Sequence, residues 1–281
     1  MTTMPSAEEI KAEVAATQPA EGTVALWWLG QASVLLKGAG AAVYIDPFFS
    51  QMPERLVPPP FTPEDAPPAD LVLVTHDHLD HLDDNTLPGL AQSSPDARFV
   101  VPAPKVSRLT GLGIPLERVV RAVADEPLDL GNGVGLVPVP AMHAFRTPPA
   151  IYDFERDEDG HHTYLGYVID FGGVRVYHAG DTLVYDGMVE RLQALRVDLA
   201  LLPINGRGYF REHSDIAGNT DEREAAQLAA EAGARVLVPI HYDMFAANLG
   251  RPGVLVEYVR ERHPELTCVV PAHGRRFIYA G

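Results

Sequence analysis

The sequence predicts a single α/β domain, and three observations lead to that prediction. Short apolar runs typical of strands alternate with longer runs typical of helices along the whole chain. The length of 281 residues fits one large domain or two small ones. No stretch has the composition of an interdomain linker, and the 46% hydrophobic content can supply a sizeable core. We therefore expect a helical segment at residues 1–20, followed by one domain at residues 21–281.

The first half of the chain should begin with a helix and a β-meander. Ser6 is a suitable cap for a helix over residues 6–17, because Glu9 follows three positions later as in a capping box. Apolar runs rich in β-branched residues predict strands at 24–29, 33–37, 43–45 and 71–74. Short helices are expected at 86–92 and 105–110.

The second half continues the alternation. Strands are expected at 134–139, 164–170, 174–177 and 236–240, with a hairpin between the second and third. Helices are expected at 186–195, 221–232 and 253–262, and Gly233 would end the second of them. The single cysteine, Cys268, lies in an apolar run and is expected to be a buried strand residue.

Four potential metal ligands follow the predicted strand at 71–74 within six residues. They are His76, His78, Asp80 and His81. His76 and His78 alternate, so their side chains can point to one side of a strand end, and the other two lie where the chain is turning. This arrangement can serve two adjacent metal ions. Imidazole suits zinc, iron, nickel or copper, while carboxylate admits magnesium and manganese.

The pattern of these residues, HxHxDH, resembles the signature of the metallo-β-lactamase superfamily. The resemblance implies an αββα sandwich with a two-metal site at one edge, whose other ligands follow later strands. His143, Asp181 and His241 each come directly after an apolar, strand-like run. We expect His76, His78 and His143 to bind one ion. The second ion would take Asp80, His81 and His241, with Asp181 bridging the two.

The same resemblance implies a hydrolase in which the two ions generate a bridging hydroxide at neutral pH. Manganese is the first choice for both ions, with zinc as the alternative. Asp80 and Asp181 are the expected catalytic carboxylates, and Asp80 could pass a proton to the leaving group. Asp77 is expected to orient a ligand. Asp46 either orients a ligand histidine or caps the loop before Pro47.

Within the superfamily, the chain most resembles the L-ascorbate-6-phosphate lactonase group, through residues 22–30, 76–83, 177–182 and 238–245. It also resembles N-acyl-phosphatidylethanolamine phospholipase D through residues 28–35 and 46–50. These resemblances imply a lactonase for a small polar or sugar-phosphate lactone. A phosphodiesterase or phospholipase D-like hydrolase is the alternative, and a β-lactam hydrolase is a further one.

Three long irregular segments, 46–68, 144–162 and 205–220, are expected to form the walls of the substrate pocket. Candidate substrate contacts lie in the second and third segments and after the last ligand; they are Arg146, Arg207, Tyr209, His213 and Tyr242. An arginine fork suits a phosphate or carboxylate, although either arginine could instead pair with loop acids. His178 and His273 are left outside the ligand set.

Composition narrows the class of partner. The chain carries 22 basic and 38 acidic residues, a net charge of −16, which disfavours a nucleic-acid substrate. No apolar run approaches the ~20 residues of a membrane span, and residues 1–20 lack the pattern of a secretory signal. With one cysteine, we expect a cytoplasmic enzyme for a small molecule. A homo-oligomer is also expected.

Overall fold

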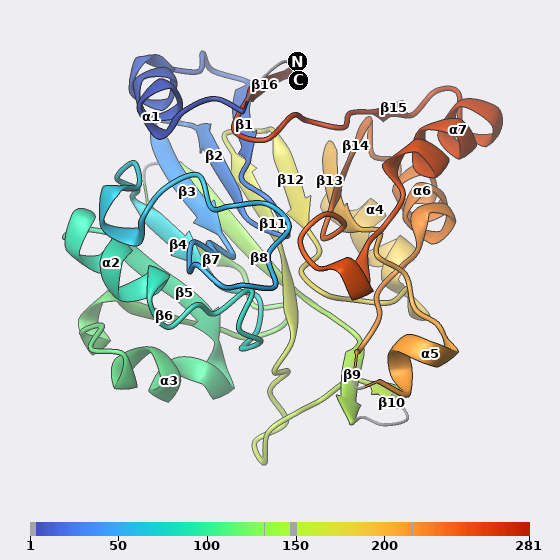
Figure 1. The fold of residues 1–281 in the computed structure, drawn as a ribbon, viewed down its shortest axis with the longest axis horizontal. Helices are drawn as coiled ribbons and strands as arrows, with labels where there is room; N and C mark the ends of the chain where they lie inside the picture. Colours follow the sequence, from blue (N-terminus) through green and yellow to red (C-terminus); the bar gives the residue numbers. More distant parts are fainter. Residues whose placement is uncertain (1–3, 132, 147–150, 215) are drawn as a thin grey trace.

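The computed structural model describes residues 4–131, 133–146, 151–214 and 216–281, with only the backbone described at 144–146. The described residues form two seven-stranded sheets that pack face to face, with helices on both outer faces (Figure 1). The predicted αββα sandwich is therefore confirmed. The described helices include none that is long and apolar enough to cross a membrane.

The first sheet has the strand order β16-β1-β2-β3-β4-β5-β6. Its strands are β1 (Thr23–Trp28), β2 (Val34–Gly38), β3 (Ala41–Ile45), β4 (Leu71–Leu73), β5 (Arg98–Pro102), β6 (Val119–Ala122) and β16 (Arg276–Ala280). The first three strands form the predicted antiparallel meander, and β3 to β6 run parallel. The C-terminal strand β16 closes the edge beside β1, a pairing that the sequence analysis did not anticipate.

The second sheet has the order β15-β14-β13-β12-β11-β8-β7. Its strands are β7 (Leu128–Asp129), β8 (Val134–Pro140), β11 (Leu165–Phe171), β12 (Arg175–His178), β13 (Leu199–Pro203), β14 (Val236–Ile240) and β15 (Thr267–Cys268). The predicted hairpin is present as β11 and β12, and β12 to β15 run parallel. Cys268 lies in a strand as expected but is only partly buried, because β15 is the sheet edge.

Helices lie over the outer face of each sheet (Figure 1). They are α1 (Ala7–Ala16), α2 (Thr86–Ser93) and α3 (Val106–Gly111) on the first sheet, and α4 (Met188–Leu195), α6 (Glu222–Glu231) and α7 (Pro252–Arg262) on the second. The short 3₁₀ helices are η1 (Pro63–Asp65), η2 (Ala103–Lys105), η3 (Leu116–Arg118) and η4 (Ala246–Asn248). Ser6 and Glu9 form the predicted capping box of α1, and Gly233 follows α6 with a φ of 78°.

Two of the segments predicted to be irregular contain regular structure. The segment after His143 holds a two-stranded sheet of β9 (His143–Arg146) and β10 (Ile151–Asp153). The segment 205–220 holds the four-residue helix α5 (Tyr209–Glu212). Both elements are too short for a periodicity signal, which explains why the sequence pattern did not show them.

Alternating side chains of the first sheet build two hydrophobic clusters. Trp28 faces the cluster between the two sheets, whereas its neighbour Trp27 faces the cluster beneath α1, α2 and α3. Ile10 and Val14 of α1 are buried in that second cluster, so the N-terminal helix packs as part of the sandwich. The Trp27 indole N–H also donates to the Glu13 carboxylate at 2.8 Å. The two hydrophobic clusters, one on each face of the first sheet, therefore hold its strand ends in place.

Candidate metal centre

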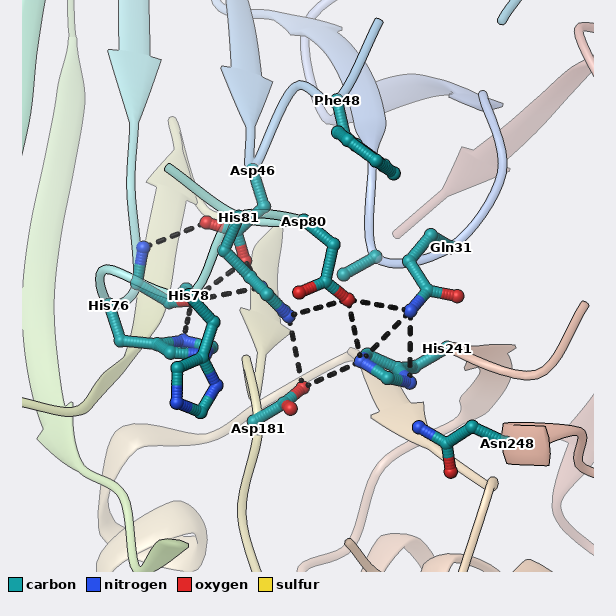
Figure 2. A network of polar contacts seen from close by, with 12 residues as sticks. Gln31, Asp46, Phe48, His76, His78, Asp80, His81, Asp181, His241 and Asn248 are labelled. Carbon is teal, nitrogen blue, oxygen red and sulfur yellow. Dashed lines mark hydrogen bonds and ion pairs between the residues drawn. The ribbon is translucent and has the colours of Figure 1, made fainter. Parts of the chain in front are cut away.

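All seven predicted metal ligands meet at one edge of the sandwich. Figure 2 labels all of them except His143. The first four lie in the turn that follows β4, and the other three follow β8, β12 and β14 of the second sheet. Both sheets therefore supply ligands. Parallel strands end at the same edge, which brings residues as far apart in the sequence as His76 and His241 into one cluster. His143, Asp181 and His241 each follow a strand of the second sheet, as expected from the apolar runs before them.

The described residues near the cluster divide into overlapping groups of three that could each hold an ion. They are His76, His81 and Asp181; His78, His143 and Asp181; and Asp80, His81 and His241, with the candidate ligand atoms of each group within 4.8 Å of one another. The last group is the predicted second site. Asp181 Oδ1 lies 3.3 Å from both His81 Nε2 and His241 Nε2, while Oδ2 lies 3.6 Å from His143 Nε2. A carboxylate in that position suits the predicted bridging role.

Asp46 holds the ligand turn from beneath. Its carboxylate accepts hydrogen bonds from the Thr75 amide at 2.8 Å and the Thr75 hydroxyl at 2.7 Å. Asp46 Oδ2 also lies 2.7 Å from His81 Nδ1. An Nδ1–H donated to this carboxylate leaves Nε2 directed at Asp181. The Thr75 hydroxyl lies 3.0 Å from His76 Nδ1 and orients that ring in the same way.

The donor set fits a metal ion, because several buried ligand atoms have no hydrogen-bond partner among the described residues. These atoms are His76 Nε2, His81 Nε2, His143 Nδ1 and Asp181 Oδ1. A buried polar atom without a partner is costly, so such a cluster calls for a cation or water. Five imidazoles and two carboxylates without a thiolate admit zinc, manganese or iron.

The electrostatics of the cluster also favour a cation. Burial, together with the nearby His81 and His78, lowers the pKa of His76 well below its usual value, and burial lowers the pKa of His143 to about 3. Both rings are therefore neutral at pH 7, as metal ligands must be. Burial opposes a charge on His81, but Asp181, Asp80 and Asp46 outweigh it and raise its pKa. The carboxylates around His81 thus favour a positive charge within the cluster.

Gln31 belongs to the centre, although the sequence analysis did not identify it. Its side-chain amide donates to Asp80 Oδ2 at 2.7 Å and lies 3.1 Å from His241 Nε2 (Figure 2). Its backbone carbonyl accepts from the His241 amide at 2.8 Å. Through Gln31, the turn between β1 and β2 therefore holds Asp80 and His241, two candidate ligands that come from opposite halves of the chain.

A second layer of contacts supports that turn. Asp243 Oδ1 accepts from the Gln31 amide at 3.0 Å, and Asp243 Oδ2 lies 2.5 Å from His273 Nε2. Trp28 stacks on Tyr242, with ring centroids 4.8 Å apart, and contacts the His273 ring from 4.2 Å. His273 therefore supports the site indirectly. His178 is fully buried, and its two ring nitrogens contact backbone groups of Ala32 and Gly180.

A cavity of ≈ 820 Å³ opens above the cluster. Its floor is made of candidate ligands, and its walls come from the ligand turn, the segments 46–68 and 205–220, and the loop after β14. The wall residues are Glu54, Leu79, Ile216, Ala217, Phe245, Ala246, Ala247 and Asn248. Two of the three segments predicted to form the walls do so. The loop after β14 contributes the largest share, whereas the sequence analysis expected only Tyr242 of this region to contact the substrate. Asn248 lies beside His241 in Figure 2.

The predicted substrate contacts lie elsewhere in the described structure. Arg207 forms a two-point ion pair with Glu224, at 2.6 and 2.7 Å, in a separate surface hollow. Tyr209 is exposed and stacks on His213, while Tyr242 packs on Trp28. None of these four lines the cavity. The Arg146 side chain lies outside the described residues.

Asp77 was expected to orient a ligand. Its carboxylate forms an ion pair with Lys105 at 2.8 Å instead, at a partly exposed position. The residue between two strand-end histidines points to the opposite side, which carries Asp77 out of the cluster. Asp46 takes the orienting role for which both residues were candidates.

Comparison with known proteins supports this architecture. Residues 42–242 match the family model described as "Beta-lactamase superfamily domain". A "UPF0173 metal-dependent hydrolase" of Methanoculleus marisnigri is 34% identical over 227 residues, covering 79% of this chain and 82% of the relative. Another of the same name, from Rubrobacter xylanophilus, is 31% identical and covers 90% of this chain and 96% of the relative. These matches do not specifically show either of the finer groups that the sequence resembles.

Solved structures show the same fold. A metallo hydrolase of Ignicoccus hospitalis aligns with a TM-score of 0.72 at 24% identity, covering 92% of this chain and 98% of that one. An isothiocyanate hydrolase from Delia radicum gut bacteria aligns with a TM-score of 0.70 at 18% identity, covering 91% and 99%. With the family match and relatives above 30% identity, the chain belongs to the β-lactamase superfamily, in the family of metal-dependent hydrolases of this fold.

Proposed function

We propose that this protein is a two-metal hydrolase that opens lactones. The observation that carries the proposal is the cluster of seven candidate ligands, five of which line a cavity large enough for a small organic substrate; these five are His78, Asp80, His143, Asp181 and His241. The described wall residues include no serine, threonine, cysteine or lysine that could act as a nucleophile. We therefore propose water at the metal centre as the attacking group. Two bound divalent ions would supply the Lewis acidity that activates this water and polarises the carbonyl.

The residues of the chain have defined tasks in such a reaction. His76, His78 and His143 would hold one ion, and Asp80, His81 and His241 the other, with Asp181 shared between them. Burial works against ionisation of Asp80, but His81 and His241 outweigh it and lower its pKa, so its carboxylate is charged at neutral pH. Asp80 borders the cavity, and 16% of its side chain is exposed. Its carboxylate can accept the proton of the attacking water and return it to the leaving alkoxide.

The sugar-phosphate part of the sequence-based expectation has weaker support than the lactone part. It rested on two arginines, and Arg207 is neutralised by Glu224 outside the cavity. The lactone proposal still has the support of the resemblance to the lactonase group and of the mostly apolar walls of the cavity, where Glu54 is the one charged residue among the described wall residues. Hydrolysis of phosphodiesters or β-lactams remains an alternative that the same centre could perform.

A substrate screen tests the proposal. Zinc- and manganese-loaded enzyme is assayed with lactones, phosphodiesters and β-lactams, and lactones should be turned over fastest. His241→Ala should abolish turnover because it removes a ligand, whereas His263→Ala, which changes a histidine outside the centre, should leave turnover unchanged. Preferred hydrolysis of a phosphodiester or β-lactam would replace the lactonase assignment. Full activity in His241→Ala would contradict the metal mechanism.

A further inference from the structure

Leu79 occupies an unusual position for a large apolar residue. It stands between two candidate ligands, His78 and Asp80, lines the cavity, and has 59% of its surface exposed. Single exposed leucines are common on protein surfaces. A leucine on the wall of a concave site, beside the reacting centre, instead provides a contact surface for a ligand.

The opposite walls of the cavity are apolar as well. Ile216 and Ala217 come from the segment after α5, and Phe245, Ala246 and Ala247 come from the loop after β14. Phe245 leans on Phe48, with ring centroids 6.4 Å apart, and its backbone bridges to Arg55. The loop 46–68 and the loop after β14 therefore form one continuous wall. Apolar residues of the ligand turn, of the segment after α5 and of the loop after β14 therefore all line the cavity above the candidate metal centre.

The charged and polar groups of the wall are few. Glu54 is an exposed carboxylate, and Asn248 is neutral, with its side-chain oxygen accepting from Asn205 at 2.9 Å. The described wall residues include no arginine or lysine. Arg55, next to Glu54, donates from Nε and Nη1 to the carbonyls of Phe48, Ser50 and Val57, at 3.0 to 3.2 Å, while its buried Nη2 has no hydrogen-bond partner among the described residues. A substrate anion away from the metals would thus face the Glu54 carboxylate, without an arginine or lysine among the described wall residues to offset it.

We infer that the cavity selects substrates whose scissile group carries an apolar substituent without negative charge. Leu79 and Phe245 would contact the substituent, and Glu54 at the wall would disfavour anions and tolerate cations. This inference rests on the proposed function only in placing the scissile group at the metal centre. It sets alkyl- or aryl-substituted neutral lactones above sugar-phosphate lactones as the substrate class.

Binding of unreactive probes tests the inference without requiring turnover. The probes are 1-octanol, octyltrimethylammonium and octanesulfonate, which share one alkyl chain, and their dissociation constants are measured on the zinc-loaded enzyme. Octyltrimethylammonium and octanol should bind more tightly than octanesulfonate. Glu54→Gln should reduce the preference for the cation over the anion by roughly two- to fivefold, as expected for an exposed charge. Glu117→Gln, which removes an exposed carboxylate outside the cavity, should leave this preference unchanged.

The apolar contact has its own pair of variants. Leu79→Ala should raise the dissociation constants of all three probes by roughly fivefold, since burial of each methylene contributes to binding. Leu116→Ala, which alters a leucine that is 64% exposed outside the cavity, should leave all three dissociation constants unchanged. Metal content is measured for each variant, so that loss of an ion is not mistaken for loss of the contact.

Two results would overturn the inference: octanesulfonate binding as tightly as the ammonium probe, or unchanged binding in Leu79→Ala with both ions retained. The proposed function fails differently. Probe binding in the expected order, with no turnover of any lactone, would support the inference about the cavity while contradicting the lactonase assignment.

Discussion

Gln31, Asp46 and His241 share a backbone conformation that residues other than glycine rarely adopt. Their φ angles are 52°, 47° and 56°, in the left-handed region. Such conformations cost on the order of 1–3 kcal/mol each and gather at functional sites, where surrounding contacts compensate. Here those contacts are the hydrogen bonds of Gln31 and Asp46 to candidate ligands and of the His241 amide to Gln31. The strain is part of how the metal centre is held in shape.

Substitution of Gln31 separates the strain from the amide contact. Gln31→Gly relieves the left-handed backbone, whereas Gln31→Ala keeps it, and both remove the donor to Asp80. Both variants should therefore bind metal roughly tenfold more weakly. Loss of a group that orients ligands usually weakens metal binding by about 10- to 100-fold, and tenfold is the lower end of that range. Gln31→Gly should have the higher melting temperature of the two. Chelator competition and thermal unfolding measure these effects. Wild-type metal affinity in both variants would show that the amide does not position Asp80.

At the scale of an element, helix α6 explains the placement of Arg207. Asp221 accepts from the amides of Arg223 and Glu224 at 2.9 Å, and Glu224 accepts from the Asp221 amide at 3.0 Å. This capping box fixes Glu224, which then takes the Arg207 guanidinium. The partner lies 17 residues further along the chain, beyond any local pattern. A loop arginine near a predicted site was therefore a weak indicator of substrate binding.

The capping box also predicts a stability effect. Asp221→Ala should lower the free energy of unfolding by about 1 kcal/mol, the usual cost of losing an N-cap. Metal stoichiometry should not change, because the cap lies outside the ligand cluster. Gln227→Ala, an exposed change on the same helix, is the matched control and should be nearly neutral. Denaturant unfolding of the two variants makes the comparison. Equal stability of Asp221→Ala and wild type would mean that packing alone holds this helix end.

At the scale of the whole molecule, the predictable part of the site is the part tied to strand ends. The ligands could be found because His143, Asp181 and His241 each follow an apolar run, and parallel strands place such residues at one edge. Gln31 and Phe245 could not be found, since they lie in loops that only tertiary packing brings to the centre. The strand order was also beyond local signals, as the pairing of β16 with β1 joins the two ends of the chain.

The ligand cluster joins the two sheets, so metal binding should stabilise the whole sandwich. His76 to His81 follow the first sheet, while Asp181 and His241 follow the second. An ion that binds only the folded chain adds about 2.7 kcal/mol at a free concentration 100 times its Kd. Removal of metal should therefore lower the melting temperature by several degrees, and reloading with zinc or manganese should restore it.

The amount and pH dependence of metal binding complete this prediction. Elemental analysis of the reloaded protein should give two ions per chain, and Asp181→Ala should give fewer, because it removes the bridging carboxylate. The carboxylates raise the pKa of His81 and His241, so protons compete with metal as the pH falls. The gain in melting temperature on loading should thus be larger at pH 8 than at pH 6. One ion per chain at saturation, unchanged in Asp181→Ala, would rule out the two-metal centre. A gain in melting temperature that does not depend on pH would show that His81 and His241 are not ligands.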